Sequence, residues 1–122
     1  MKFKESKPIY LQIADRICDE ILQGQYKEEE RIPSVREYAA TVEVNANTVV
    51  RSFDYLQSQD IIYNKRGLGY FVGQGARERI LELRKNVFLT EELPEFFRQV
   101  KTLGIPIKEI ERMYNQEFLN EK

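Results

Sequence analysis

The chain has 122 residues, of which 42% are hydrophobic and 32% are charged, and its formal net charge is −1. This composition is typical of a folded globular protein rather than a disordered one. It holds no histidine and one cysteine, Cys18, which excludes Ser-His and Cys-His nucleophile pairs, histidine zinc sites and an internal disulfide. The first eight residues form no secretory signal, and no apolar run approaches the ~20 residues of a membrane span. These features predict a cytoplasmic protein.

The first predicted helix covers residues 8–23. Pro8 suits a first helical turn, and an apolar residue recurs every three or four positions from Tyr10 to Ile21. Gly24 supplies a stop. Cys18 lies inside this apolar pattern, which indicates a packing role. Residues 24–33 then form a polar connection.

Two further helices are predicted on either side of a short turn at residues 42–44. Ser34 and Glu37 have the spacing of a capping box, in which each side chain accepts a hydrogen bond from the other residue's backbone N–H. This short helix should end near residue 41. Asn45 is a preferred N-cap residue, so the next helix should begin there and run to about residue 59.

Residues 61–72 change to a β-favouring pattern. The runs at 61–64 and 70–72 are separated by a turn in which Gly67 and Gly69 can take positive φ. A two-stranded hairpin is predicted, and it must pack on the helices because an isolated hairpin is marginal in water. The stretch superficially resembles a dinucleotide-binding loop, but Val72 stands where that motif needs its third glycine.

The remaining residues are helical again. A helix should begin at Ala76, Thr90 should cap another, and Gly104 and Pro106 should separate two apolar stripes. The stripes carry more apolar surface than a lone pair of helices can bury, so a second copy of the chain is expected to cover them in a symmetric interface. The alternative is that they pack on the winged helix of their own chain. The predicted dimerisation residues are Leu93, Phe96, Phe97, Val100, Leu103, Ile107, Ile110, Tyr114 and Phe118.

The order of these elements is that of a winged helix-turn-helix, whose second helix enters the DNA major groove. Asn47 can offer a bidentate amide to adenine, Thr48 can bond to bases or phosphate, and Ala46 can meet a thymine methyl group. Arg51 is placed for a phosphate one turn further on. Arg36 lies in the capped first turn of the preceding helix, where free N–H groups also favour phosphate.

Each of these features also has an ordinary structural interpretation. Asn45 is a good cap whatever the function, the polar residues after it suit a solvated first turn, and the arginines suit a charged surface. The arrangement at compatible spacings is what favours DNA binding. Residues 61–85 add six basic side chains against two acidic ones, and such a local positive patch attracts phosphate.

Three ordered segments, residues 8–39, 44–62 and 65–72, resemble the GntR family of bacterial transcription regulators. The short helical remainder is similar to the YtrA-like subfamily, which carries a small dimerisation element in place of a large effector domain. The resemblance implies a mainly α fold with a small β-hairpin. A winged helix-turn-helix DNA-binding domain would cover residues 1–75 and a helical dimerisation element residues 76–122. The implied function is a dimeric repressor on a two-fold symmetric operator.

The resemblance also implies, position by position, which residues contact DNA. Many relatives have arginine where this chain has Ala46 and Val50, so two potential guanine or phosphate contacts are missing and the base preference need not follow the family's. Lys65 joins the set because it lies in the same basic turn as the two wing-tip residues. The candidate DNA-binding residues are Ser34, Arg36, Asn45, Ala46, Asn47, Thr48, Arg51, Lys65, Arg66 and Gly67.

Two rival functions explain the sequence less well. A protein-interaction module that uses the C-terminal helices without DNA affinity leaves Asn47, Arg51 and the basic hairpin unexplained. An enzyme would have to use acidic clusters such as residues 28–30, which are more simply solvated turns. No cofactor and no metal are expected. The sequence leaves the existence of a small effector open, although about fifty residues after the hairpin leave little room for a pocket of ~300 Å³ or more.

Overall fold

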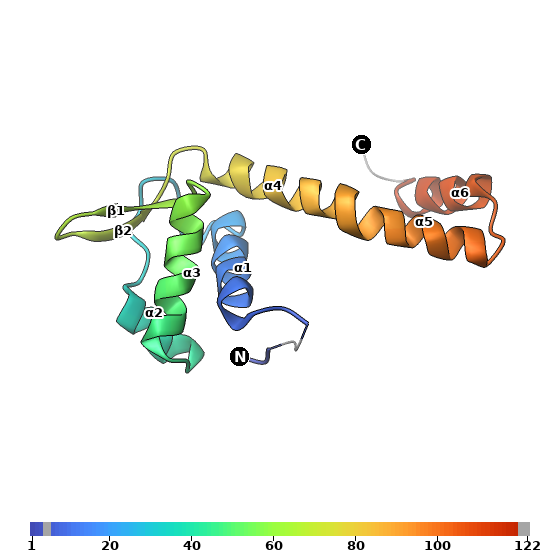
Figure 1. Ribbon diagram of the computed structural model, residues 1–122. Helices are drawn as coiled ribbons and strands as arrows, with labels where there is room; N and C mark the ends of the chain where they lie inside the picture. The colour runs from blue at the N-terminus through green and yellow to red at the C-terminus, as the bar shows by residue number, and fades with distance from the viewer. Residues whose placement is uncertain (4–5, 120–122) are drawn as a thin grey trace. The chain divides into compact units, whose positions relative to one another are not determined.

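The computed structural model describes residues 1–3 and 6–119, and residues 4, 5 and 120–122 lie outside this range. The chain forms two compact units, Met1–Glu82 and Leu83–Lys122 (Figure 1). The prediction of a mainly α fold with one β-hairpin is confirmed. In chain order the elements are α1 (Ile9–Leu22), α2 (Val35–Val42), α3 (Ala46–Ser58), β1 (Ile62–Lys65), β2 (Gly69–Val72), α4 (Ala76–Val87), the π-helical segment η1 (Phe88–Glu92), α5 (Leu93–Thr102) and α6 (Ile107–Glu117).

Helices α1 and α3 lie side by side and supply a large part of the core of the first unit (Figure 1). Ile13 and Ile17 of α1 are fully buried, as are Phe53 and Leu56 of α3. Cys18 is buried in the same apolar stripe, in agreement with its predicted packing role. Burial of one apolar face on each helix leaves the opposite face of α3 at the surface.

Local signals place the ends of α2 as the sequence predicted. The Ser34 hydroxyl accepts from the Glu37 backbone N–H at 3.1 Å, and the Glu37 carboxylate accepts from the Ser34 N–H at 2.9 Å. The capping box is therefore confirmed. After α2 the chain turns at Glu43, whose φ of 58° is left-handed, and the Val44 N–H closes the turn on the Ala39 carbonyl at 3.1 Å.

The hairpin forms as predicted, with Ile62 opposite Val72 and Lys65 opposite Gly69. The segment before α2 departs from prediction, because part of the expected polar connection pairs with the free edge of β2. Arg31 forms a bridge with Phe71, and the Ile32 N–H donates to the Tyr70 carbonyl at 2.9 Å. This extra pairing ties the hairpin to the start of α2 and satisfies backbone groups on the outer edge of β2.

The prediction that Thr90 caps a new helix is wrong. Helical segments follow one another without a break from Ala76 to Thr102, and Thr90 lies inside η1. Its hydroxyl donates to the Asn86 carbonyl at 2.8 Å, one turn back along the same helix. A threonine hydroxyl can satisfy a preceding carbonyl as readily as it caps a helix start, and here it takes the first role.

The turn between α5 and α6 is the one the sequence predicted at Gly104. Gly104 has φ +68°, the Ile105 N–H donates to the Val100 carbonyl at 3.0 Å, and the Gly104 N–H donates to the Lys101 carbonyl at 3.1 Å. This pair of bonds is a Schellman motif, which ends a helix on a left-handed residue. Pro106 then stands at the N-cap position of α6.

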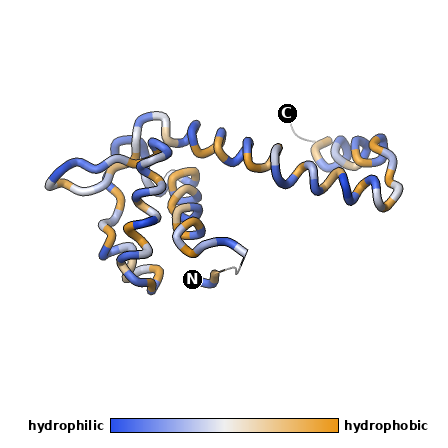
Figure 2. The backbone as a smooth tube through the Cα atoms, viewed as in Figure 1, coloured by the Kyte–Doolittle hydropathy of each residue, from blue (hydrophilic) through white to orange (hydrophobic). Residues whose placement is uncertain are grey.

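Apolar side chains of the second unit lie largely at its surface. Apolar and polar residues alternate along α5 and α6 (Figure 2). Val100 is buried, with 9% of its surface exposed, whereas Leu103 is 72% exposed. Among the described residues, eleven of the sixteen exposed large apolar side chains belong to this unit or to the end of α4 that enters it. The unit does not cover its own apolar surface.

Candidate DNA interface

The start of α3 presents short polar and apolar side chains to solvent. Asn45 is the N-cap, and its Oδ1 accepts from the Asn47 backbone N–H at 2.8 Å. Ala46, Asn47 and Val50 are exposed, whereas Val49, Phe53 and Leu56 form the buried stripe of the same helix. Helical periodicity puts positions 46, 47 and 50 on one side of the first two turns. This is the part of a recognition helix that meets base edges in a helix-turn-helix protein.

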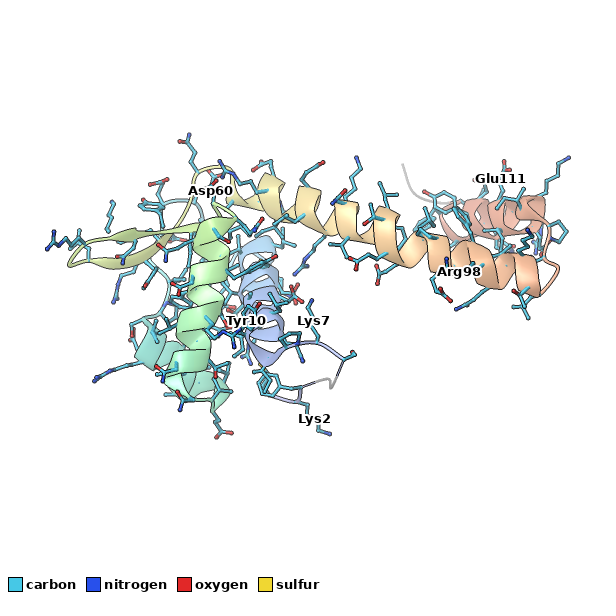
Figure 3. The ribbon with its side chains drawn as sticks, viewed as in Figure 1. Lys2, Lys7, Tyr10, Asp60, Arg98 and Glu111 are labelled. Carbon is cyan, nitrogen blue, oxygen red and sulfur yellow. The ribbon has the colours of Figure 1, made fainter. Side chains whose placement is uncertain are left out.

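Arg51 stacks on an aromatic ring of α1. Its guanidinium carbon lies 4.2 Å from the centre of the Tyr10 ring, a cation–π contact. The buried Ser52 hydroxyl donates to the Tyr10 carbonyl at 2.7 Å, which fixes the start of α1 against α3 (Figure 3). The Arg51 side chain is therefore held against α1, and it remains exposed at the surface.

The N-terminal end of α2 is a second place where backbone N–H groups face outward. Arg36 is exposed in its first turn. The Glu37 carboxylate already accepts from the Ser34 backbone N–H, and this bond, together with the Ser34 side chain, holds the pKa of the Glu37 carboxyl below the ordinary value of 4.5. Because this carboxylate adds negative charge at the helix start, attraction of a phosphate here depends on Arg36 and on the remaining free N–H groups.

The hairpin carries a basic tip on an aromatic base. Tyr63 and Phe71 stack with ring centres 5.9 Å apart, and the Lys65 ammonium lies 4.7 Å above the Phe71 ring. Arg66 is exposed in the turn, and Gly67 has the positive φ, +80°, that the sequence predicted. The turn thus exposes two cations and a glycine, which lets the backbone approach a groove closely.

Arg31 braces this turn from the preceding segment, and the sequence analysis did not single it out. Its Nε donates to the Leu68 carbonyl at 3.1 Å. A Cβ on Gly69 would lie 2.9 Å from that Nε, so the side chain fits only because residue 69 is glycine. Local patterns could not reveal this contact, since it joins residues 37 positions apart in the sequence.

All ten candidate DNA-binding residues belong to the first unit, and they fall into two groups. Eight are exposed, while Ser34 and Thr48 are half-buried. One group lies at the starts of α2 and α3 and the other at the hairpin tip, which are separate projections of this unit (Figure 1). A recognition helix plus a basic hairpin gives two regions that can contact neighbouring parts of a duplex.

Other kinds of site find little support in the described part of the chain. Residues 1–3 and 6–119 contain no group of His, Cys, Asp or Glu side chains that could hold a metal ion. Within the same range, every helix is too short or too polar to cross a bilayer. An open hollow of about 220 Å³ lies beside Ile21, Tyr26 and Arg77 and is smaller than the ~300 Å³ of typical ligand pockets.

A helix-turn-helix with an exposed second helix, followed by a basic hairpin, defines the winged helix-turn-helix class of DNA-binding proteins. The profile described as "Bacterial regulatory proteins, gntR family" matches residues 9–72, just over half of the chain. The chain belongs to the GntR family of transcription regulators.

Two relatives from Bacillus subtilis (strain 168) match nearly the whole chain. The uncharacterized HTH-type transcriptional regulator YhcF is 36% identical over 109 residues, which cover 89% of this chain and 88% of YhcF. The HTH-type transcriptional repressor YtrA is 29% identical over 107 residues, covering 88% of this chain and 82% of YtrA. Both are similar in length to this chain, as expected for the YtrA-like subfamily. The relatives are transcriptional regulators and not enzymes.

Solved structures agree with this assignment. A GntR-family protein from Bacteroides thetaiotaomicron is 64% identical, with a TM-score of 0.82 over 93% of this chain and 99% of that one. The DNA-binding domain of AraR, solved in complex with operator ORR3, is 27% identical, with a TM-score of 0.54 over 60% of this chain and 88% of that one. The chain is therefore a GntR-family transcriptional regulator with a DNA-binding domain.

Proposed function

We propose that the protein is a dimeric repressor that acts in the cytoplasm and binds a two-fold symmetric DNA operator. The observation that carries this proposal is the exposed start of α3, where Ala46, Asn47 and Val50 lie at the surface of a helix whose apolar stripe is fully buried. The fold does not need an exposed amide beside apolar side chains at this position, because asparagine is a poor helix former. The same group of side chains matches the edges of bases.

The candidate residues divide into base contacts and backbone contacts. Asn47 would donate to and accept from an adenine edge, while Ala46 would meet a thymine methyl group. Arg36, Arg51 and the helix starts capped by Ser34 and Asn45 would position the protein on phosphates, which carry no sequence information. In α3, Thr48 would bond to a base or phosphate. The hairpin tip, with Lys65, Arg66 and Gly67, would approach the minor groove.

The second unit would hold two copies together. Its exposed apolar side chains include Phe96, Phe97 and Leu103, which are 41%, 48% and 72% exposed in the described part of the unit. At ~25 cal/mol per Å², even a few hundred Å² of apolar surface contributes several kcal/mol before the costs of association. The proposed dimerisation element, residues 76–122, would begin at the start of α4. The second compact unit begins slightly later, at Leu83.

The proposed sign of regulation rests on a relative. YtrA, which matches 88% of this chain, is named a repressor. A dimer of two recognition helices on a promoter would compete with polymerase for the same DNA.

Selection of bound sequences from random duplex DNA tests the proposed function. The full-length chain should select an inverted repeat whose half-site centres lie about 10 base pairs, or a multiple, apart. A single asymmetric site would contradict the dimeric operator, and failure to enrich any sequence would favour an interaction module without DNA affinity.

Sedimentation of the full-length chain tests the dimer separately. Leu103→Glu should shift the protein toward monomer because it places a charge in the apolar stripe. Thr102→Glu is the matched control, since Thr102 is an exposed neighbour outside the stripe. A monomeric wild-type chain, or equal behaviour of the two variants, would contradict the proposed interface.

A further inference from the structure

The proposed base-facing side of α3 holds an apolar residue that the fold leaves partly exposed. Val50 is 40% exposed and follows Ala46 by one turn, so the two side chains are neighbours on the helix surface. A β-branched residue is a poorer helix former than alanine, and at this position two fifths of its surface stays open to solvent. Its presence is therefore better explained by what it meets outside the chain.

Positive charge is absent from the side of α3 on which Val50 lies. Positions 46, 47, 50 and 54 share this side, and they are alanine, asparagine, valine and aspartate. The nearby cation, Arg51, has its guanidinium over the Tyr10 ring at 4.2 Å. The base-facing side thus offers one amide, two apolar side chains and, a turn further on, an acceptor.

Base-pair chemistry decides what such a surface fits. Guanine presents two acceptors in the major groove and is best contacted by the forked donors of arginine or by lysine. Thymine presents a C5-methyl group, and adenine presents the donor and acceptor pair that an asparagine amide matches. Ala46 and Val50 therefore suit thymine methyl groups, with Asn47 between them suited to adenine.

We infer that Val50 is a specificity-determining residue, and that the recognition helix selects A·T pairs through contact of Val50 and Ala46 with thymine C5-methyl groups. This inference rests on the proposed function, because it assumes that α3 enters the major groove. The inference specifies that each half-site contains a thymine methyl group next to an adenine. It assigns contact with that methyl group to Val50, which is outside the candidate set.

Replacement of thymine by deoxyuridine tests the inference, since it removes the C5-methyl group and leaves base pairing intact. The full-length chain is titrated against its selected operator with symmetric T-to-U changes at one position at a time. At one or two positions of each half-site, affinity should fall about three- to fivefold per half-site, the factor that loss of one buried methyl group produces. Val50→Ala should bind less tightly and show no further loss at the position Val50 contacts.

Val50→Ala should keep the fold, because alanine is the better helix former and the side chain is exposed. Leu68→Ala is the matched control, an exposed apolar residue at the hairpin tip whose truncation should leave the uracil losses in the half-site unchanged. Specific binding of the operator with no uracil loss anywhere, or with losses that Val50→Ala retains, would overturn the inference and leave the proposed function intact. Equal binding of operator and random duplex would instead overturn the proposed function.

Discussion

Arg31 and Gly69 should be energetically coupled in the hairpin. Gly69→Ala places a methyl group at a φ of +110° and 2.9 Å from the Arg31 Nε, so the guanidinium must leave the Leu68 carbonyl. Backbone strain should cost about 1–3 kcal/mol of hairpin stability, and loss of the hydrogen bond about 1 kcal/mol more. In an Arg31→Ala background only the strain remains, so the cost of Gly69→Ala should drop by about 1 kcal/mol.

Gly67→Ala is the matched control for this cycle. Gly67 also has a positive φ, +80°, but a Cβ there would meet nothing within 4 Å. Its cost should therefore be the same with and without Arg31. Amide hydrogen exchange of the hairpin measures the free energy of local opening in all variants. A Gly69→Ala cost that is independent of residue 31 would refute the proposed brace, as would equal coupling of Gly67 and Arg31.

Three further predictions test the assignments of single residues. Asn47→Ala should cost roughly 1–3 kcal/mol on the operator and relax base preference at one position, whereas Arg51→Ala should weaken all duplexes alike and reduce the salt slope by about one; equal, sequence-independent losses would show the roles are wrong. Tyr10→Leu should weaken all duplexes about two- to fivefold by removing the ring under Arg51, and Tyr10→Phe should not; if both lose equally, the hydroxyl and not the ring matters. Ser34→Ala should cost about 1 kcal/mol of stability and raise the pKa of the Glu37 carboxyl, which an NMR titration would detect; an unchanged pKa would show that the Ser34 hydroxyl does not set it.

The pKa direction at Glu37 also fixes the sign of a pH effect. A folded-state pKa below the ordinary 4.5 means that the carboxylate contributes stability above pH 4.5. That contribution should be lost as the pH falls through the lower pKa of the folded state.

Features that depend on nearby residues were predictable from the sequence. The Ser34 capping box, the Asn45 cap, the stop at Gly104 and the hairpin at Gly67 all involve residues within a few positions of one another, and the structure has each of them. Thr90 shows the limit of such signals, because the same hydroxyl can cap a helix or bond back within one, and sequence alone favours neither.

Contacts between distant residues could not be predicted in this way. The pairing of Arg31 with β2 and the stacking of Arg51 on Tyr10 join segments about 40 residues apart, and no periodicity in the sequence records them. The candidate DNA-binding residues themselves stay predictions until a duplex is bound.

The central claim is that the exposed start of α3 recognises a specific DNA sequence. Titration of the full-length chain against its selected operator and against a base-shuffled duplex of equal length, at several salt concentrations, tests that claim most directly. Binding of the operator should be at least about a thousandfold tighter than binding of the shuffled duplex at physiological salt, and both affinities should fall steeply as salt rises. Equal affinity for the two duplexes, or binding of neither, would contradict that claim.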